Sequence, residues 1–329
     1  MMMSSPMFAT VVMPVRNGSR TIASAIASVL QESKFPMELL VVDDGSTDNT
    51  KQCVSGFDDP RVRLMKNEGS GQSDALNTGI ANSRGNVFMR CDSDDLYAPG
   101  RIDWQLERLI AEPRIQGVCG EVSAITNDGK LLGRLSNQIP SEESASDLLN
   151  SGQMCAHLGA YAIRIDAVRD AGGFRGFFKY SQDYDFLFRV AQRHALKFLA
   201  KPAYTIRFSS GSVCRRTPFR VRQWYKEKAQ EFRIERLAQG TDPLQRGELV
   251  TQPDESDAPP EVEKVNRSIS DVLGGIAWEH FRQESYGDAI GAAARAVSWT
   301  PLRLSAYISL TKLFVLTSNK RLRGLLKQS

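Results

Sequence analysis

The sequence predicts an α/β protein in which a mostly parallel β-sheet is flanked by helices and is followed by a helical C-terminal extension. Residues 8–135 alternate short apolar runs with segments of helical periodicity, as expected for strands joined by crossover helices. Two of these strand-like runs end in clusters of acids, at residues 43–48 and 92–95. From residue 266 onward the pattern is helical. We therefore expect one sheet-based domain followed by helices.

The individual elements follow from local patterns. Residues 10–15, 39–42, 62–65 and 87–91 are short apolar runs and are predicted to be strands. Ser19 is predicted to cap a helix that reaches Leu30, and residues 73–81 form a second helix. After the turn at residues 171–174, a further helix begins near Ser181.

The chain divides into four regions by composition. Residues 1–214 form the sheet domain, with 8–135 as its first half and 136–214 as a continuation that carries a second functional surface. Residues 215–239 form a basic helix. Residues 240–265 contain four prolines among acids and are predicted to be a linker or mobile loop. Residues 266–329 form the helical region.

The composition restricts the function. The 329 residues are 41% hydrophobic and 24% charged, which excludes collagen, disorder of the whole chain and a polytopic membrane protein. A net charge of +4 is too small to indicate binding to nucleic acid. Five scattered cysteines and three histidines form no disulfide framework or zinc-ligand spacing, which favours a reducing compartment. With no signal-peptide pattern and no apolar run of about 18 residues, we expect a cytoplasmic protein.

The acid clusters indicate a cation site. The carboxyl ends of parallel strands share one edge of a sheet, where open α/β folds bind ligands. Asp92 and Asp94 stand two residues apart and would repel each other unless a cation lay between them. Oxygen ligands favour Mg²⁺ or Mn²⁺, and such an ion suggests a diphosphate ligand. The alternative is that the acids only cap turns, with Ser46 and Thr47 capping the following helix. Taken alone, the clusters favour that alternative.

Five motifs in order change this balance. Residues 10–17, VVDDGSTD at 41–48, GQSDALNTGIANSRG at 71–85, MRCDSDDLYAPG at 89–100 and GGFRGFFKYSQDYDFLFRV at 172–190 resemble the successive motifs of family 2 glycosyltransferases. The resemblance covers about residues 8–213. It implies the GT-A fold, a nucleotide-sugar donor, a divalent cation and inversion at the anomeric carbon. In this family, residues 8–135 would bind the nucleotide sugar and 136–214 would face the acceptor.

The resemblance also implies roles for individual residues. Asp44 resembles the acid that binds the uracil ring, Asp92 and Asp94 resemble the metal-binding DxD pair, and Asp183 resembles the general base. The implied donor-binding residues are Pro14, Val15, Arg16, Asn17, Asp43, Asp44, Gln72, Ser73, Asp74, Asn77, Asp92, Ser93 and Asp94. The acceptor-side candidates are Asp95, His157, Gln182 and Arg207, with a structural role favoured for His157.

Some positions depart from the family pattern. Arg16 stands where the family often has Tyr or Thr, and Gln182 stands where it often has Glu. Leu76 stands where many members have a basic residue. No QxxRW motif occurs, so we expect transfer of one sugar per encounter rather than processive synthesis.

Alternatives to the enzyme are a non-catalytic nucleotide-sugar or glycan-binding protein, a phosphoacceptor signalling domain and a glycosidase. The expected partners are a UDP-sugar in preference to GDP- or dTDP-sugars, and a glycan or lipid-linked acceptor. Basic residues at 215–236 and in the tail would contact an anionic membrane peripherally, although solvated helix faces explain such charges as well. The C-terminal helices could also form a homo-oligomer.

Overall fold

The computed structural model describes residues 6–31, 33–135, 144–208, 219–253, 270, 273–278, 281, 285–299 and 304–325. The strands are β1 (Ala9–Val15), β2 (Met37–Asp43), β3 (Val62–Lys66), β4 (Val87–Arg90), β5 (Leu96–Tyr97), β6 (Gly117–Thr126), β7 (Leu131–Arg134), β8 (Tyr161–Arg164) and β9 (Leu196–Phe208). The helices are α1 (Ile22–Val29), α2 (Thr50–Ser55), α3 (Gly71–Ala81), α4 (Arg101–Ala111), α5 (Ala145–Asn150), α6 (Ile165–Asp170), α7 (Gln182–Ala191), α9 (Phe219–Gln239), α11 (Tyr286–Trp299) and α12 (Leu304–Leu325), with a short 3₁₀ turn, η1, at Leu158–Ala160.

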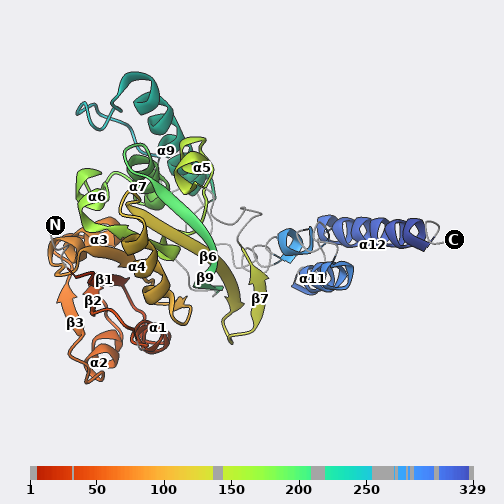
Figure 1. Cartoon of the computed structure of the whole chain (residues 1–329), viewed down its shortest axis with the longest axis horizontal. Helices are drawn as coiled ribbons and strands as arrows, with labels where there is room; N and C mark the ends of the chain where they lie inside the picture. The colour runs from red at the N-terminus through yellow and green to blue at the C-terminus, as the bar shows by residue number, and fades with distance from the viewer. Residues whose placement is uncertain are drawn as a thin grey trace. The chain divides into compact units, whose positions relative to one another are not determined.

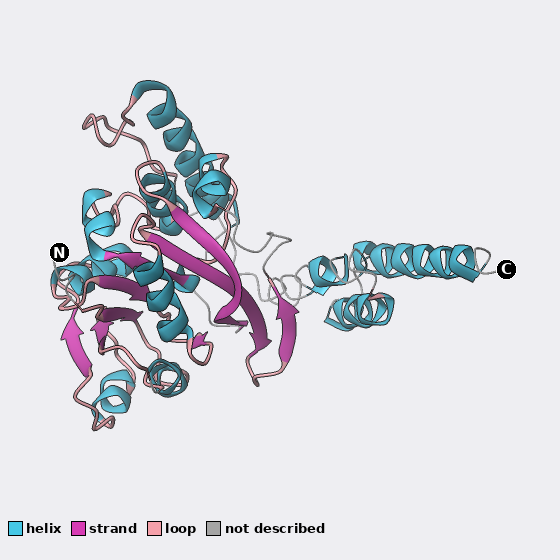
Figure 2. Ribbon diagram, viewed as in Figure 1, coloured by secondary structure: helices cyan, strands magenta, loops and turns pink. Residues whose placement is uncertain are grey.

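The sheet follows the order β3-β2-β1-β4-β8-β6-β9-β5, and β7 pairs with β6 (Figure 1, Figure 2). The pairs β3–β2, β2–β1 and β1–β4 are parallel, whereas β8 runs antiparallel to both β4 and β6. Every residue of β1 and β2 is buried, which explains their continuous apolar sequences. The predicted mixed, mostly parallel sheet is therefore confirmed.

The predicted strands and helices of residues 10–91 are present, and no end is shifted by more than three residues. The predicted cap at Ser19 is wrong, because α1 begins at Ile22 and Thr21 occupies the N-cap position. The Ser19 backbone N–H instead donates to the Asp48 carboxylate at 3.1 Å. Ser46 and Thr47 do not cap α2 either, because that helix begins at Thr50 after Asn49.

Close packing fixes α3 against the first strands. Helix α3 contacts β1 and β2 and carries its first turn to the edge where those strands end. A Cβ atom at Gly79 would lie 2.3 Å from the Val12 Cγ1 atom, so only glycine allows this approach. The position of α3 is important below because its N-terminus adjoins the acid that follows β2.

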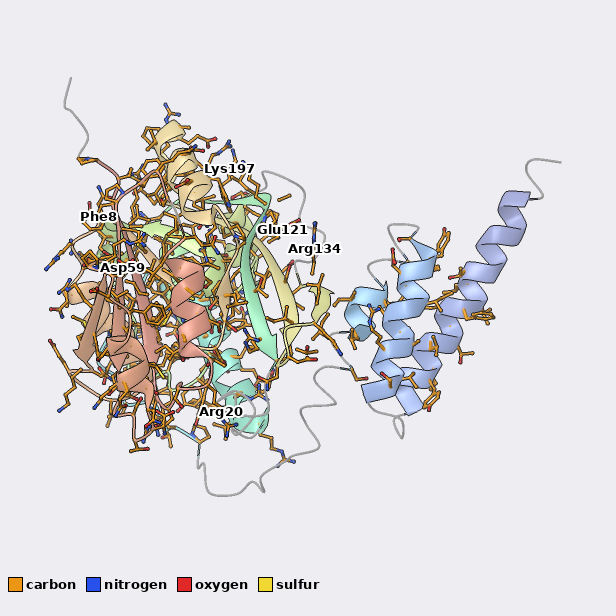
Figure 3. The ribbon with its side chains drawn as sticks, turned by 90° about the horizontal axis from the view of Figure 1, so that it is seen from below. Phe8, Arg20, Asp59, Glu121, Arg134 and Lys197 are labelled. Atoms are coloured by element: carbon orange, nitrogen blue, oxygen red, sulfur yellow. The ribbon has the colours of Figure 1, made fainter. Side chains whose placement is uncertain are left out.

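The chain forms two compact units. The first comprises Met1–Val122, Ile139–Arg207 and Pro218–Ala258, and the second comprises Ser123–Gln138, Phe208–Thr217 and Pro259–Ser329. The first contains the parallel strands and both acid clusters. In the second, α11 and α12 lie side by side around Ala292, Ala293 and Leu313 (Figure 3). The boundaries that the sequence suggests at residues 214, 239 and 265 stay predictions. Within the described part of the chain, no helix combines the length and apolarity needed to cross a membrane.

A buried ion-pair network joins α7 to α9 and to the segment after it. The Asp185 carboxylate on α7 accepts hydrogen bonds from Arg175 at 3.0 Å and from Arg189 at 2.9 Å. Arg175 also donates to Asp242 at 2.9 Å, and Asp242 pairs with Arg236 of α9. Burial opposes ionisation of Asp185 and Asp242, but the arginines outweigh it and lower the pKa of both acids. Residues 240–253 are thus anchored to the first unit through Asp242.

We predict that Asp242→Asn strongly destabilises the protein. The amide would leave the buried charges of Arg175 and Arg236 without this partner, and the free energy of unfolding should fall by about 3–5 kcal/mol. Denaturant unfolding measures the change. Glu107→Gln, which breaks an exposed ion pair with Lys34, is the matched control and should leave stability nearly unchanged. Equal stability of the two variants would contradict the role assigned to Asp242.

Candidate active site

The first acid cluster is joined to the N-terminus of α3. Asp43 is the last residue of β2, and Asp44 follows it. The Asp44 carboxylate accepts the Gly71 backbone N–H at 3.0 Å and the Asn67 side-chain amide at 2.7 Å. Asp43 is buried and accepts the Ser46 N–H at 3.1 Å. An acid at a helix N-terminus is stabilised by the helix dipole, so Asp44 also has a local structural role.

The end of β1 lies beside this cluster. Pro14 and Val15 are buried within the strand, whereas Arg16 and Asn17 are exposed beyond it. Asn17 adopts a left-handed conformation with φ of 56°. Its N–H donates to the Ser46 hydroxyl at 2.9 Å, and its side-chain oxygen accepts the Thr47 N–H at 2.8 Å. Of the four candidates from this strand, only Arg16 and Asn17 therefore present side chains to solvent.

The second acid cluster is held by a buried arginine. Arg90 ends β4, and its guanidinium contacts both Asp92 carboxylate oxygens, at 2.7 and 2.9 Å. Burial would lower the pKa of Arg90, but the negative charges of Asp92 and Asp183 outweigh it and the pKa is raised. The Tyr204 hydroxyl accepts the Asp92 backbone N–H at 2.8 Å and donates to the Asp95 carboxylate. Strand β9 thereby fixes the loop that carries the acids.

The other two acids of this cluster, Asp94 and Asp95, have raised pKa values. Burial, followed by the charge of Asp92, raises the pKa of Asp94 to about 6. Burial and the charges of Asp94 and Asp92 raise the pKa of Asp95 well above its ordinary value. The charges of Arg90 and Arg207 lower the pKa of Asp94, but they only partly offset three carboxyl groups within four residues. The local electrostatic potential therefore favours a bound cation.

Arg207 and His157 adjoin the same acids. The Arg207 backbone N–H donates to Asp95 at 2.8 Å, and its Nε donates to the Asp94 carbonyl at 3.0 Å. His157 stacks on the Tyr204 ring with centroids 5.3 Å apart. Burial and the charge of Arg90 lower the pKa of His157. The charges of Asp92 and Asp183 act in the opposite direction but do not outweigh them. His157 and Arg207 are therefore placed beside the second cluster.

The chemistry of these side chains fits a hard cation. Ligand atoms of Asp92, Asp95 and His157 lie within 4.8 Å of one another. Carboxylate oxygens suit Mg²⁺ or Mn²⁺. His157 fits less directly, because its Nδ1 accepts the Gly159 N–H at 3.1 Å, which in the neutral ring leaves the proton on Nε2. Asp94 does not belong to this group of three, so the predicted ligand pair Asp92 and Asp94 stays a prediction.

Asp183 lies in the first turn of α7, within electrostatic reach of the second cluster. Its charge raises the pKa of Arg90 and opposes the lowering of the pKa of His157. The neighbouring Gln182 side chain donates to Gln72 in the first turn of α3. The N-termini of α7 and α3 therefore meet, which connects the surroundings of Asp183 to those of Asp44.

Other predicted donor residues have structural partners. Asn77 exchanges two hydrogen bonds with the backbone of Phe174, at 2.7 and 2.9 Å. The Ser73 hydroxyl donates to the Phe178 carbonyl at 3.3 Å, and Asp74 accepts the Ser70 N–H at 3.0 Å. These bonds position the 174–178 loop on α3. Ser93 is half-buried beside Gly18, where a Cβ atom would lie 3.1 Å from the serine Oγ.

Sequence reasoning missed Arg90 and Tyr204. A signal for Arg90 was present, because residues two apart on a strand share a face and Arg90 precedes Asp92 by two. Tyr204 lies 112 residues from Asp92 in the sequence, and no spacing rule connects them. The structure brings Asp92, Asp94, Asp95, His157 and Arg207 into one neighbourhood, with Asp183 within electrostatic reach of it.

The family model for glycosyl transferase family 2 matches residues 10–172, which contain both acid clusters. Residues 10–172 belong to glycosyl transferase family 2. This family resemblance was predicted from the motifs, and the match confirms it. The similarity to transferases thus applies to this domain.

Curated relatives of this family 2 domain include bacterial transferases and synthases. The UDP-Glc:alpha-D-GlcNAc-diphosphoundecaprenol beta-1,3-glucosyltransferase WfgD of Escherichia coli is 33% identical over 36% of this chain and 47% of its own length. The chondroitin synthase of Pasteurella multocida is 24% identical over 59% of this chain and 20% of its own length. The chain therefore spans less than half of these relatives.

Solved structures agree on the fold. The crystal structure of S. aureus TarS 1-349 in complex with UDP-GlcNAc superposes with a TM-score of 0.56 at 15% identity. The match covers 97% of this chain and 92% of that one. The GT-A fold, predicted from the resemblance, and the C-terminal helices, predicted from the sequence pattern, are thereby confirmed.

We predict that Tyr204→Phe destabilises the protein. The variant removes the acceptor of the Asp92 N–H and the donor to Asp95, and a buried group left without its partner costs about 1–3 kcal/mol. Thermal or denaturant unfolding measures this. Tyr307→Phe makes the same change at an exposed position of α12 and should have no effect. A Tyr204→Phe protein as stable as the parent would show that these bonds do not hold the acid loop.

Proposed function

We propose that this protein transfers a sugar from a nucleotide-diphosphate donor, preferably a UDP-sugar, to an acceptor hydroxyl with inversion at the anomeric carbon. One series of contacts carries the proposal. Asp44 binds the N-terminus of α3, Gln72 of α3 contacts Gln182, and Asp183 next to it acts electrostatically on the Arg90–Asp92 pair. Asp44, expected to bind the uracil ring, is thus linked through α3 and α7 to Asp183, the expected general base, and to Asp92, expected to bind the cation.

The names of similar proteins support this donor. WfgD is named as a transferase that uses UDP-Glc, and TarS has been crystallised with UDP and with UDP-GlcNAc. The polysaccharide synthases among the relatives support a glycan or a lipid-linked glycan as the acceptor.

The donor would lie along the edge where β1, β2 and β4 end. Asp44, with Asp43 buried behind it, would accept the imide N–H of the uracil ring, and Arg16 and Asn17 would border the nucleoside. Asp92 and Asp94, with Asp95 beside them, would hold Mg²⁺ or Mn²⁺, which when bound offsets the negative charge on the departing diphosphate.

Asp183 would act as the general base. Its carboxylate would accept the proton of the acceptor hydroxyl while that oxygen attacks the anomeric carbon from the face opposite the diphosphate. The bond from the anomeric carbon to the phosphate oxygen then breaks, and the nucleoside diphosphate departs with the electron pair. His157, Gln182 and Arg207 adjoin this region and would orient the acceptor. A single transfer per encounter fits the lack of a QxxRW motif in the sequence.

A thermal-shift screen tests the donor class. Binding to the folded state raises apparent stability, so UDP with Mn²⁺ should raise the melting temperature more than GDP or dTDP with Mn²⁺. The same nucleotides without the metal are the control. A lack of any metal-dependent shift would argue against the whole assignment.

We predict that Asp183→Asn separates catalysis from donor binding. Loss of a general base reduces turnover by about 10²–10⁴-fold, whereas the metal-dependent shift with UDP should persist. Donor hydrolysis or transfer to an acceptor glycan measures the rate. Asp166→Asn, at an exposed acid of α6, is the matched control and should keep full activity.

The same experiment distinguishes the second candidate function, a nucleotide-sugar or glycan-binding protein without activity. The parent protein would then bind UDP but neither hydrolyse nor transfer the sugar. Activity that persists in Asp183→Asn would assign the base to another residue.

A further inference from the structure

Helix α12 has two distinct faces. Ala306, Leu313 and Thr317 are buried, and their spacing places them on one side of the helix. Leu313 of this side belongs to a core cluster with Ala292 and Ala293 of α11. On the opposite side, Ile308 and Val315 are 43% and 50% exposed. These residues stand seven apart, which is about two helical turns, so they share a face.

The exposed face is apolar and basic. Lys312 stands four residues after Ile308 and three before Val315, and Leu316 stands four after Lys312. Leu316 is 41% exposed. We call Ile308, Lys312, Val315 and Leu316 the outer face of α12. Single exposed apolar residues are common, but three on one helical face around a lysine are typical of helices that lie in a membrane interface.

The positive charge of the surrounding sequence favours an anionic partner. Residues 289–329 contain seven Lys and Arg residues and no Asp or Glu. An anionic surface complements this composition, and each basic residue near such a surface strengthens binding about fivefold. Two copies of α12 that paired through this face would bring lysines together with no acid from residues 289–329 to offset them, so self-association is disfavoured.

We propose that the outer face of α12 docks the protein on anionic lipid bilayers. Ile308, Val315 and Leu316 would enter the headgroup boundary, and Lys312 would contact lipid phosphates. This inference goes beyond the proposed function and does not depend on it.

Vesicle co-sedimentation of the full chain tests the proposal. The protein should pellet with phosphatidylcholine vesicles that contain phosphatidylglycerol, should not pellet with pure phosphatidylcholine, and should be released by high salt. Lys312→Glu should weaken binding about fivefold or more. The double variant Ile308→Asp and Val315→Asp should weaken it at least about tenfold.

Leu249→Asp is the matched control, because Leu249 is a fully exposed leucine of the first unit. Circular dichroism verifies that each variant retains its helices. If the double aspartate variant does not fold, Ile308→Ser with Val315→Ser replaces it.

Two outcomes would overturn the proposal. The first is equal pelleting of the parent and the outer-face variants. The second is a lack of binding of the parent to anionic vesicles. An oligomer that the outer-face variants dissociate, seen by sedimentation velocity, would then assign this face to self-association. The nucleotide-dependent thermal shift is measured without lipid, so failure here is distinguishable from failure of the proposed function.

Discussion

Three carboxyl groups within four residues repel one another, and the structure depends on how that repulsion is offset. The buried Arg90 guanidinium holds Asp92 through two hydrogen bonds. Burial and the charges of the neighbouring acids raise the pKa values of Asp94 and Asp95. A loop in this state is stable only when its backbone is fixed, and Tyr204 and Arg207 fix it from β9. The negative potential that remains suits the binding of a cation.

The same region illustrates how structural and functional roles coexist in one residue. Asp44 stabilises the N-terminus of α3, and the resemblance assigns it to the nucleotide base. His157 accepts a backbone N–H through Nδ1 and stacks on Tyr204, yet it also adjoins the acids. The structural bonds orient these side chains before any ligand binds. Preorganisation of this kind lowers the cost of binding a charged donor.

The ion-pair network of α7 likewise fixes side chains in place, at a distance from the second acid cluster. Asp185 follows Asp183 by two residues and is held by Arg175 and Arg189. Asp242 ties Arg175 to Arg236, so the segment after α9 contributes to the placement of α7. Burial makes each of these charges costly alone, and the network compensates by giving each a partner. Residues beyond the family-matched region therefore help to hold the first turn of α7.

The sequence by itself determined the parallel strands and the positions of the acids, because local periodicity and motif order carry that information. Residues 39–42 are apolar on both faces, and the acids come directly after strands, so both features could be predicted from the sequence. Helix starts were harder to predict from the sequence. Ser19, Ser46 and Thr47 are all residues that suit an N-cap position, but none of them occupies one in the structure. Only the tertiary structure decided which side chains meet. The pairing of Tyr204 with Asp92 and of Asp242 with Arg175 joins residues far apart in sequence, and such contacts depend on how the strands and helices pack.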